Sequence, residues 1–393
     1  MWGNALKIAR IRGFDIKVDA SWLLIATLIV WSLATAYFPT ELPGFNTATL
    51  VASAVVAMLG LFASLILHEL AHAEVAGHFG LHISGISLFL FGGVAEMQSE
   101  PSSGKSEFWT AIAGPITSAC LALAFWFCAQ IADVISAPEP ARLVLHYLAW
   151  INMMLAVFNL IPAFPMDGGR ILRAWLWARS GNMLEATKHA TAVSAVFAYT
   201  FMGLGLFATF TGSVAAGLWP ILIGLFLLAT SRAALAQLET KTALGGRTVA
   251  ELMTRHPWTA HPDQTLSDLV NRIFLEHGIS FVPIVENGML LGYVDLQIVR
   301  KIDREHWTTT SVEDVMENID AGNTVSSRLA CLDLMSLMMK TGQRKFIVAD
   351  DNKLVGVITL SDVLAYLSVF RQVTDPKPDN VAKHPRIRAK SGH

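Results

Sequence analysis

The chain has 393 residues, of which 53% are hydrophobic and 15% are charged. In soluble proteins about a quarter of the residues are charged. This composition therefore excludes an ordinary soluble protein and favours a membrane protein. The formal net charge of -2 gives no sign of nucleic-acid binding. Long apolar runs fill residues 20–236, whereas residues 240–393 carry charges throughout. The sequence therefore predicts a membrane-embedded part followed by a soluble part.

Six apolar segments are long enough to cross the hydrocarbon core of a bilayer, which takes about 20 helical residues. They lie at residues 20–38, 49–78, 109–135, 143–164, 190–211 and 214–231. If the N-terminus is cytosolic, the basic residues concentrate in the inside loops and the outside loops hold only Arg142. The positive-inside rule therefore predicts a multi-pass protein of the cell membrane with both termini in the cytosol. A cleaved signal peptide is the alternative interpretation of the first segment.

The second apolar segment contains the motif H-E-x-x-H, formed by His68, Glu69 and His72. Helical positions four apart lie about 40° apart on one face, so both imidazoles can reach one zinc ion. Glu69 then lies beside them, where a water at the metal would be. Ionisable residues at membrane depth are costly, so this cluster requires a bound ion, a water-filled cavity or mutual pairing. A hydrogen-bonded His–Glu cluster without metal is the alternative.

A catalytic zinc usually has three protein ligands and one open position, so a third ligand is needed. His78 has the spacing of the third histidine in soluble metzincins, but Val75 replaces their glycine turn and a continuing helix carries His78 off the ligand face. Asp167 is the stronger candidate, because two prolines break the helix before it and two glycines after it permit close backbone approach. Alternatively, Asp167 caps the helix expected over residues 171–178.

The H-E-L-A-H motif is followed about a hundred residues later by N-x-x-P-x-x-P-x-D-G-G-R, and the two together resemble the site-2 protease family. Residues 91–95, Phe-Gly-Gly-Val-Ala, and residues 113–115, Ala-Gly-Pro, extend the resemblance. By position it implies that His68, His72 and Asp167 bind one zinc ion and that Glu69 is the general base.

The resemblance leaves the oxyanion-stabilising group open. Some members of the family carry Asn a few residues after the Gly-Pro pair, where this chain has Thr117 and Ser118. On the resemblance alone, Asn159 is the candidate for this catalytic role.

The resemblance implies an intramembrane zinc metalloprotease that cuts membrane proteins, single-pass ones above all, within or near the bilayer. A substrate helix must be unwound locally, and residues 82–98, rich in β-formers and glycine, could offer a strand edge to hold it. An amphipathic interfacial segment is the alternative for these residues. A metal or ion transporter using the same His/Asp cluster and a catalytically dead scaffold are the rival functions, although the six segments show no duplicated halves.

The soluble part contains an internal repeat. Residues 249–253, Val-Ala-Glu-Leu-Met, match residues 312–316, and residues 291–295 match residues 355–359. The pattern resembles a pair of CBS motifs, tandem modules that often bind adenosine-containing ligands. The expected fold is thus a multi-pass α-helical membrane domain over residues 1–238 with a short membrane-associated β region, followed by a soluble α/β tandem CBS module. The domain ranges are 246–370 for this module, 246–306 and 309–370 for its two motifs, and 374–393 for a disordered tail.

The CBS resemblance implies at most one complete nucleotide site. Thr359 and Asp362 match the family's ribose-holding pair, whereas Asp295 and Ile298 of the first copy do not. ATP or AMP bound there would regulate the protease through a different affinity for two arrangements of the module. The alternatives are that Asp362 only begins a helix and that the module makes a homodimer.

Overall fold

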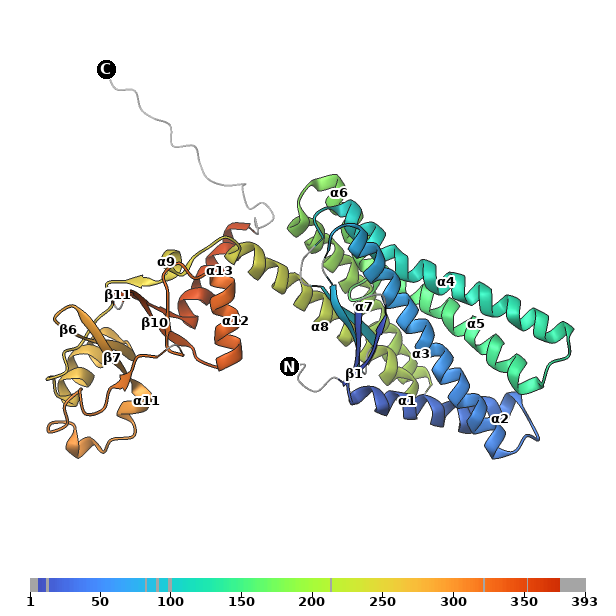
Figure 1. Cartoon of the computed structure of the whole chain (residues 1–393), viewed down its shortest axis with the longest axis horizontal. Coiled ribbons are helices and arrows are strands. Elements are labelled where there is room, and N and C mark those ends of the chain that lie inside the picture. The colour runs from blue at the N-terminus through green and yellow to red at the C-terminus, as the bar shows by residue number, and fades with distance from the viewer. Residues whose placement is uncertain are drawn as a thin grey trace, which may run out of the picture. The chain divides into compact units, whose positions relative to one another are not determined.

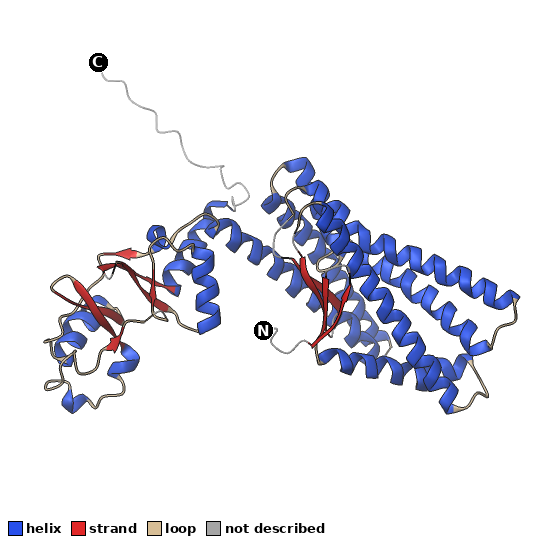
Figure 2. Ribbon diagram, in the orientation of Figure 1, coloured by secondary structure: helices blue, strands red, loops and turns tan. Residues whose placement is uncertain are grey.

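The structure, a computed structural model of the chain, has two compact units, Met1–Ala236 and Gln237–His393. It describes residues 6–11, 14–81, 83–89, 92–97, 101–212, 214–320, 322–351 and 353–374. Helices dominate the first unit, whereas the second combines helices and strands (Figure 2). The tail predicted to be disordered lies outside the described residues, apart from Thr374.

Six helical segments of the described residues are long and apolar enough to cross a membrane, which confirms the prediction of a multi-pass helical domain. The first, Ser21–Glu41, joins α1 (Ser21–Ser32), the π-helix η1 (Leu33–Tyr37) and α2 (Phe38–Glu41). The others are α3 (Thr47–His78), α4 (Gly104–Val134), α5 (Glu139–Asn159), α7 (Met183–Thr211) and α8 (Val214–Leu244). A shorter helix, α6 (Asp167–Ser180), lies between α5 and α7 in the chain.

The helix ends differ from the predicted ones where polar residues take part in helices. α4 and α7 begin several residues before the predicted positions, because the side chains of Ser103 and Asn182 cap their first turns. α8 continues past the predicted residue 231 to Leu244. The fourth span was predicted to reach residue 164, but α5 ends at Asn159. A loop that contains two prolines follows and leads into α6.

The membrane helices pack through small side chains. Ala54, Ala57, Ala111 and Ala156 are buried within the bundle, whereas large apolar side chains such as Phe127 are exposed on its outside. Small residues at the contacts let helix backbones approach closely, which is the way helices associate in lipid. α4 and α5 run side by side over most of their length (Figure 1).

A four-stranded sheet accompanies the helices of the first unit. Its strands are β1 (Leu6–Ile11), β2 (Phe14–Val18), β3 (Ile83–Phe89) and β4 (Gly92–Met97), in that order, with β2 parallel to β3 and the other pairs antiparallel. The predicted β region is thus present as β3 and β4, although residues 82, 90, 91 and 98 are outside the described residues. The sequence did not predict β1 and β2, whose charged side chains pair across the hairpin, as Lys7 and Asp15 do at 2.6 Å.

The second unit contains two short sheets with strand orders β5-β11-β10-β9 and β6-β7-β8. Its elements are α9 (Val249–Leu252), β5 (Thr254–Arg255), α10 (Leu266–Asp268), the π-helix η2 (Leu269–Leu275), β6 (Phe281–Glu286), β7 (Met289–Asp295), α11 (Leu296–Val299), the 3-10 helix η3 (Arg304–His306), β8 (Glu317–Asn318), β9 (Thr324–Val325), α12 (Cys331–Thr341), β10 (Lys345–Asp350), β11 (Lys353–Thr359) and α13 (Leu360–Thr374). Residues 313–315 form a turn, although they match part of α9 in the repeat.

The two copies of the repeat exchange strands. β5 of the first copy pairs with β11 of the second, and β8 of the second pairs with β7 of the first. Where each exchanged strand pairs, a glycine of one copy lies against a methionine of the other. A Cβ on Gly356 would lie 2.9 Å from Met253 Sδ, and a Cβ on Gly292 would lie 3.3 Å from Met316 Sδ. The Met and Gly positions that match in the repeat therefore form the same contact twice, each time between a methionine of one copy and a glycine of the other.

Candidate metal centre

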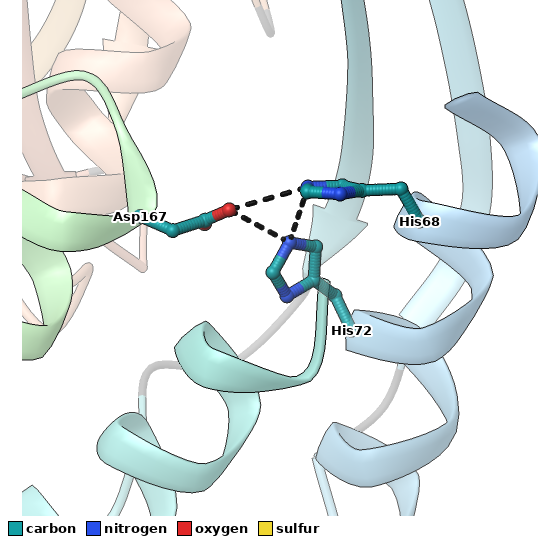
Figure 3. A group of neighbouring side chains, drawn as sticks. All are labelled: His68, His72 and Asp167. Atoms are coloured by element: carbon teal, nitrogen blue, oxygen red, sulfur yellow. Dashed lines mark hydrogen bonds and ion pairs between the residues drawn. The ribbon is translucent and has the colours of Figure 1, made fainter. Parts of the chain in front are cut away.

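Three buried side chains converge within the helical bundle. His68 and His72 project from successive turns of α3, and Asp167 is the first residue of α6 (Figure 3). Asp167 Oδ2 lies 3.2 Å from His68 Nε2 and 3.1 Å from His72 Nε2, and the two Nε2 atoms are 3.2 Å apart. The structure therefore brings together one donor atom from each of the three predicted ligands.

Helix α4 holds the orientation of both imidazole rings through hydrogen bonds to their Nδ1 atoms. His72 Nδ1 donates to the backbone carbonyl of Thr110 at 2.6 Å, and His68 Nδ1 forms a 2.8 Å hydrogen bond with Ser118 Oγ. Because a carbonyl only accepts, the proton of neutral His72 is on Nδ1 and its Nε2 carries a lone pair. An outer partner that fixes the tautomer in this way accompanies most metal-bound histidines.

The donor set fits a zinc ion. Lone pairs of Asp167 Oδ2 and His72 Nε2 face each other across 3.1 Å, which is repulsive unless a proton or a cation lies among the converging atoms. Ligands about 2.0–2.1 Å from a tetrahedral zinc are about 3.3 Å from one another. The observed separations of 3.1 to 3.2 Å are close to that value.

Gly114 of α4 keeps the space beside the imidazoles open. A Cβ at this position would lie 2.3 Å from His72 Nε2 and 2.5 Å from His68 Nε2, at the two atoms that would bind a metal. Any larger residue would therefore occupy the face of the site that the two nitrogens share.

The loop between α5 and α6 places Asp167 next to the two histidines. A Cβ on Gly168 would lie 2.3 Å from the carbonyl oxygen of Ile161, so only glycine permits this close backbone approach. The N–H of Phe164 in the loop donates to Ser194 Oγ of α7 at 2.9 Å. α6 begins at Asp167, earlier than predicted, with Met166 as its N-cap and no side-chain cap. The carboxylate therefore faces the histidines and does not cap the helix.

Asp167 remains ionised in these surroundings. Burial alone would raise the pKa of its carboxyl group, but the two imidazoles beside it and the charge of Arg170 hold the pKa below its ordinary value. Arg170 Nη1 lies 3.6 Å from Asp167 Oδ1, the oxygen that faces away from the histidines. One carboxylate oxygen is thus near Arg170, and the other is directed at the two imidazole nitrogens.

The remaining predicted residues lie outside this three-residue group. Glu69 follows His68 on α3 and is half-buried, with no hydrogen bond or ion pair to any described residue. Asn159 is the last residue of α5 and is half-buried, and among the described contacts none joins its side chain to the group. His78, the rival third ligand, is exposed at the end of α3 and is not part of the group.

The sequence did not reveal the roles of Thr110, Gly114 and Ser118. The available signal is the Gly-Pro pair inside α4. Pro115 has no N–H for the carbonyl of Ala111, which follows the Thr110 carbonyl that accepts from His72. Nothing in a hydroxyl such as that of Ser118 indicates a partner 50 residues away.

In the soluble unit, Thr359 and Asp362 form a capping box at the start of α13. The N–H and the hydroxyl of Thr359 both donate to Asp362 Oδ2 at 2.8 Å, and the N–H of Asp362 donates to Thr359 Oγ1 at 3.3 Å. In the first copy, Asp295 caps α11 with its own carboxylate. The two copies therefore begin the equivalent helix with different chemistry.

Comparison with known proteins decides the family. The sequence matches peptidase family M50 over residues 56–203 and the CBS domain over residues 249–304 and 312–369. It is 33% identical to zinc metalloprotease Rip3 of Mycobacterium tuberculosis over 95% of each chain. The chain belongs to peptidase family M50, the site-2 proteases. It is thus a zinc metalloprotease with a C-terminal CBS pair.

A curated sequence and a solved structure from Methanocaldococcus jannaschii are also similar to this M50 protease. A zinc metalloprotease is 30% identical over 93% of this chain and 97% of its own length. The solved structure of a site-2 protease covers 58% of this chain and 94% of its own at 30% identity, with a TM-score of 0.40.

Replacing Gly114 with alanine should abolish metal binding by this M50 protease without unfolding it. The added methyl group would occupy the shared face of the two imidazoles, so we expect zinc affinity to fall by more than about 100-fold, the upper end of the loss for an outer-shell partner. Gly77→Ala on α3 is the matched control, since a Cβ there meets nothing within 4 Å. Equal zinc affinity in the two variants, measured by chelator competition, would contradict the arrangement.

Ser118→Ala should weaken zinc binding by about 10- to 100-fold, because His68 loses the partner that fixes its ring. Thr117→Ala is the control, since among the described residues the Thr117 hydroxyl donates to the carbonyl of Ala113 in its own helix. The same chelator titration separates the two variants, and an unchanged affinity in Ser118→Ala would show that the hydrogen bond does not support the ligand.

Proposed function

We propose that His68, His72 and Asp167 hold one zinc ion per chain and that Glu69 is the general base of an intramembrane peptide hydrolysis. The observation that carries this proposal is the convergence of three buried electron-pair donors, each oriented by a partner outside the group. Their chemistry is that of a catalytic site, because three protein ligands leave a position for water or substrate. A transport role for the cluster is not favoured in a chain of this peptidase family.

The chain's own residues supply the proton transfers. Zinc in this site would polarise the scissile carbonyl and make a water more acidic. Glu69, whose carboxylate has no partner among the described residues, takes a proton from the attacking water as the oxygen bonds to the carbonyl carbon. It then gives the proton to the amine nitrogen as the C–N bond breaks. Asn159 is the candidate to stabilise the oxyanion, on the family resemblance.

The substrates we propose are membrane proteins, single-pass ones above all. His72 lies six residues before the end of α3, about 9 Å along the helix, so the site is close to one membrane surface. With both termini in the cytosol, as the basic loops predict, that surface is the cytosolic one. β4 is an edge strand of the described sheet and could hold an unwound substrate segment by main-chain hydrogen bonds.

Glu69→Gln should leave zinc bound and stop cleavage. Loss of a general base costs about 10²- to 10⁴-fold in rate, so cells carrying this variant should accumulate a single-span membrane stub that is absent from the wild type. Glu74→Gln is the matched control, an exposed glutamate on the same helix. Comparison of the membrane proteomes checks this, and identical proteomes for wild type and Glu69→Gln would contradict the assigned role.

We also propose that the CBS pair binds ATP or AMP near Thr359 and Asp362 and thereby regulates the protease. The support is the match of these residues to the ribose-holding pair of CBS modules. A homodimer formed through this module is the alternative role.

The nucleotide proposal predicts that ATP or AMP raises the melting temperature of the full-length protein and that Asp362→Ala removes this shift. Asp314→Ala is the control, because Asp314 forms a similar capping contact with Ser311 in the same unit and has no proposed nucleotide role. Both variants lose a cap worth about 1 kcal/mol, so only nucleotide binding distinguishes them. If neither nucleotide changes the melting temperature or the activity of the wild type, the regulatory proposal fails and the dimer is favoured.

A further inference from the structure

A buried ion pair joins α4 to α6 close to the metal centre. The side chain of Glu107, in the first turn of α4, is 0% exposed, and that of Arg173 on α6 is 14% exposed. Arg173 Nε donates to Glu107 Oε1 at 2.8 Å, and Arg173 Nη2 donates to the same oxygen. The two residues are 66 positions apart in the chain, so this contact is tertiary.

Both helices of the pair carry parts of the metal centre. α4 carries Thr110 and Ser118, which orient the two histidines, and α6 begins with Asp167. The Arg173 guanidinium also lies over the ring of Phe164, 5.3 Å from its centroid, in the loop that delivers Asp167. The ion pair therefore connects the helix that orients two ligands to the segment that supplies the third.

A second contact sets the distance between the same two helices. A Cβ on Gly104 would lie 2.6 Å from the carbonyl oxygen of Ala174, so α4 and α6 approach each other at backbone distance. Backbone packing of this kind fixes separation, but it permits sliding and rotation. A directional pair one residue away from Ala174 restricts both movements.

Stability alone does not account for this ion pair. Removing two charges from water costs more than their attraction returns unless the remaining polar atoms are satisfied. Glu107 Oε2 is buried and has no hydrogen-bond partner among the described residues. An apolar pair of similar volume would serve the fold as well or better, whereas an ion pair selects one register of α6 against α4.

We propose that Glu107 and Arg173 are positioning residues for zinc binding, which hold Asp167 at the distance from His68 and His72 that the metal requires. The inference rests on the proposed function, since it assumes zinc bound by these three residues. Neither residue touches the metal position, and each acts through the placement of α6.

The test is the zinc dissociation constant of the full-length protein in detergent, measured by chelator competition well below the melting temperature of each metal-free variant. Glu107→Gln should bind zinc at least about 10-fold more weakly than the wild type, the loss typical of outer-shell partners, and Arg173→Lys should retain part of the affinity. The zinc affinity of Asp167→Ala gives the reference value for complete loss of the third ligand.

The control is Asp133→Asn, which removes a partly exposed ion pair from the other end of α4. Asp133 Oδ1 lies 3.4 Å from Arg142 Nη1, and it is 26 residues, about 39 Å of helix, from Glu107. We expect this variant to bind zinc like the wild type.

The outcomes separate the inference from the function on which it rests. If Glu107→Gln melts earlier but binds zinc as tightly as Asp133→Asn, the pair is structural and the inference is overturned. If the wild type itself binds no zinc, the proposed function fails, and the inference with it. Should Glu107→Gln not fold, the double variant Glu107→Gln/Arg173→Met leaves no unpaired buried charge, and the same comparison of zinc affinities decides.

Discussion

The membrane domain is organised around the cost of placing two imidazoles and a carboxylate in an apolar bundle. Each of these groups needs a partner away from water. The rings obtain theirs from α4, through the carbonyl of Thr110 and the hydroxyl of Ser118, and Asp167 obtains one from Arg170. His72 Nε2 and Asp167 Oδ2 are left with electron pairs that face each other beside His68 Nε2, an arrangement that a cation among the three atoms would satisfy. The site is thus specified by the partners that its residues already have.

This requirement explains why α4 has an unusual sequence for a membrane helix. It begins with a buried carboxylate, Glu107, and contains glycine and proline side by side at positions 114 and 115. The glycine leaves room beside the imidazoles, and the carboxylate pairs with α6. The glycine and the proline each weaken an isolated helix. α4 is therefore the helix against which the three converging side chains are placed.

The sequence predicted those parts of the molecule that follow from local rules. Apolar length gave the six membrane helices, the four-residue spacing gave His68 and His72 on one face, and helix-breaking residues indicated Asp167. The contacts of Ser118, Thr110 and Glu107 could not be predicted, because they join residues 38 to 66 positions apart and depend on which helices pack together. β1 and β2 were also missed, although the apolar and polar residues of β2, Phe-Asp-Ile-Lys-Val, alternate as in a strand.

In the soluble unit, too, local sequence features could be predicted and tertiary contacts could not. The repeated Met and Gly positions were visible in the sequence, but the exchange of β5 and β8 between the copies was not. The capping box of Thr359 and Asp362 gives these residues a structural role in α13 whether or not a nucleotide binds. Only binding experiments on the full-length protein can therefore separate the two roles.

The most direct test of the account is the zinc content per chain, measured by elemental analysis of detergent-purified protein, for the wild type beside His72→Ala and Asp167→Ala. The account predicts about one zinc per wild-type chain and a clear loss in both variants, provided that all three proteins are folded. A folded wild type without zinc, purified without chelator, would contradict the metal centre. Zinc retained undiminished in Asp167→Ala would show that a different residue supplies the third ligand.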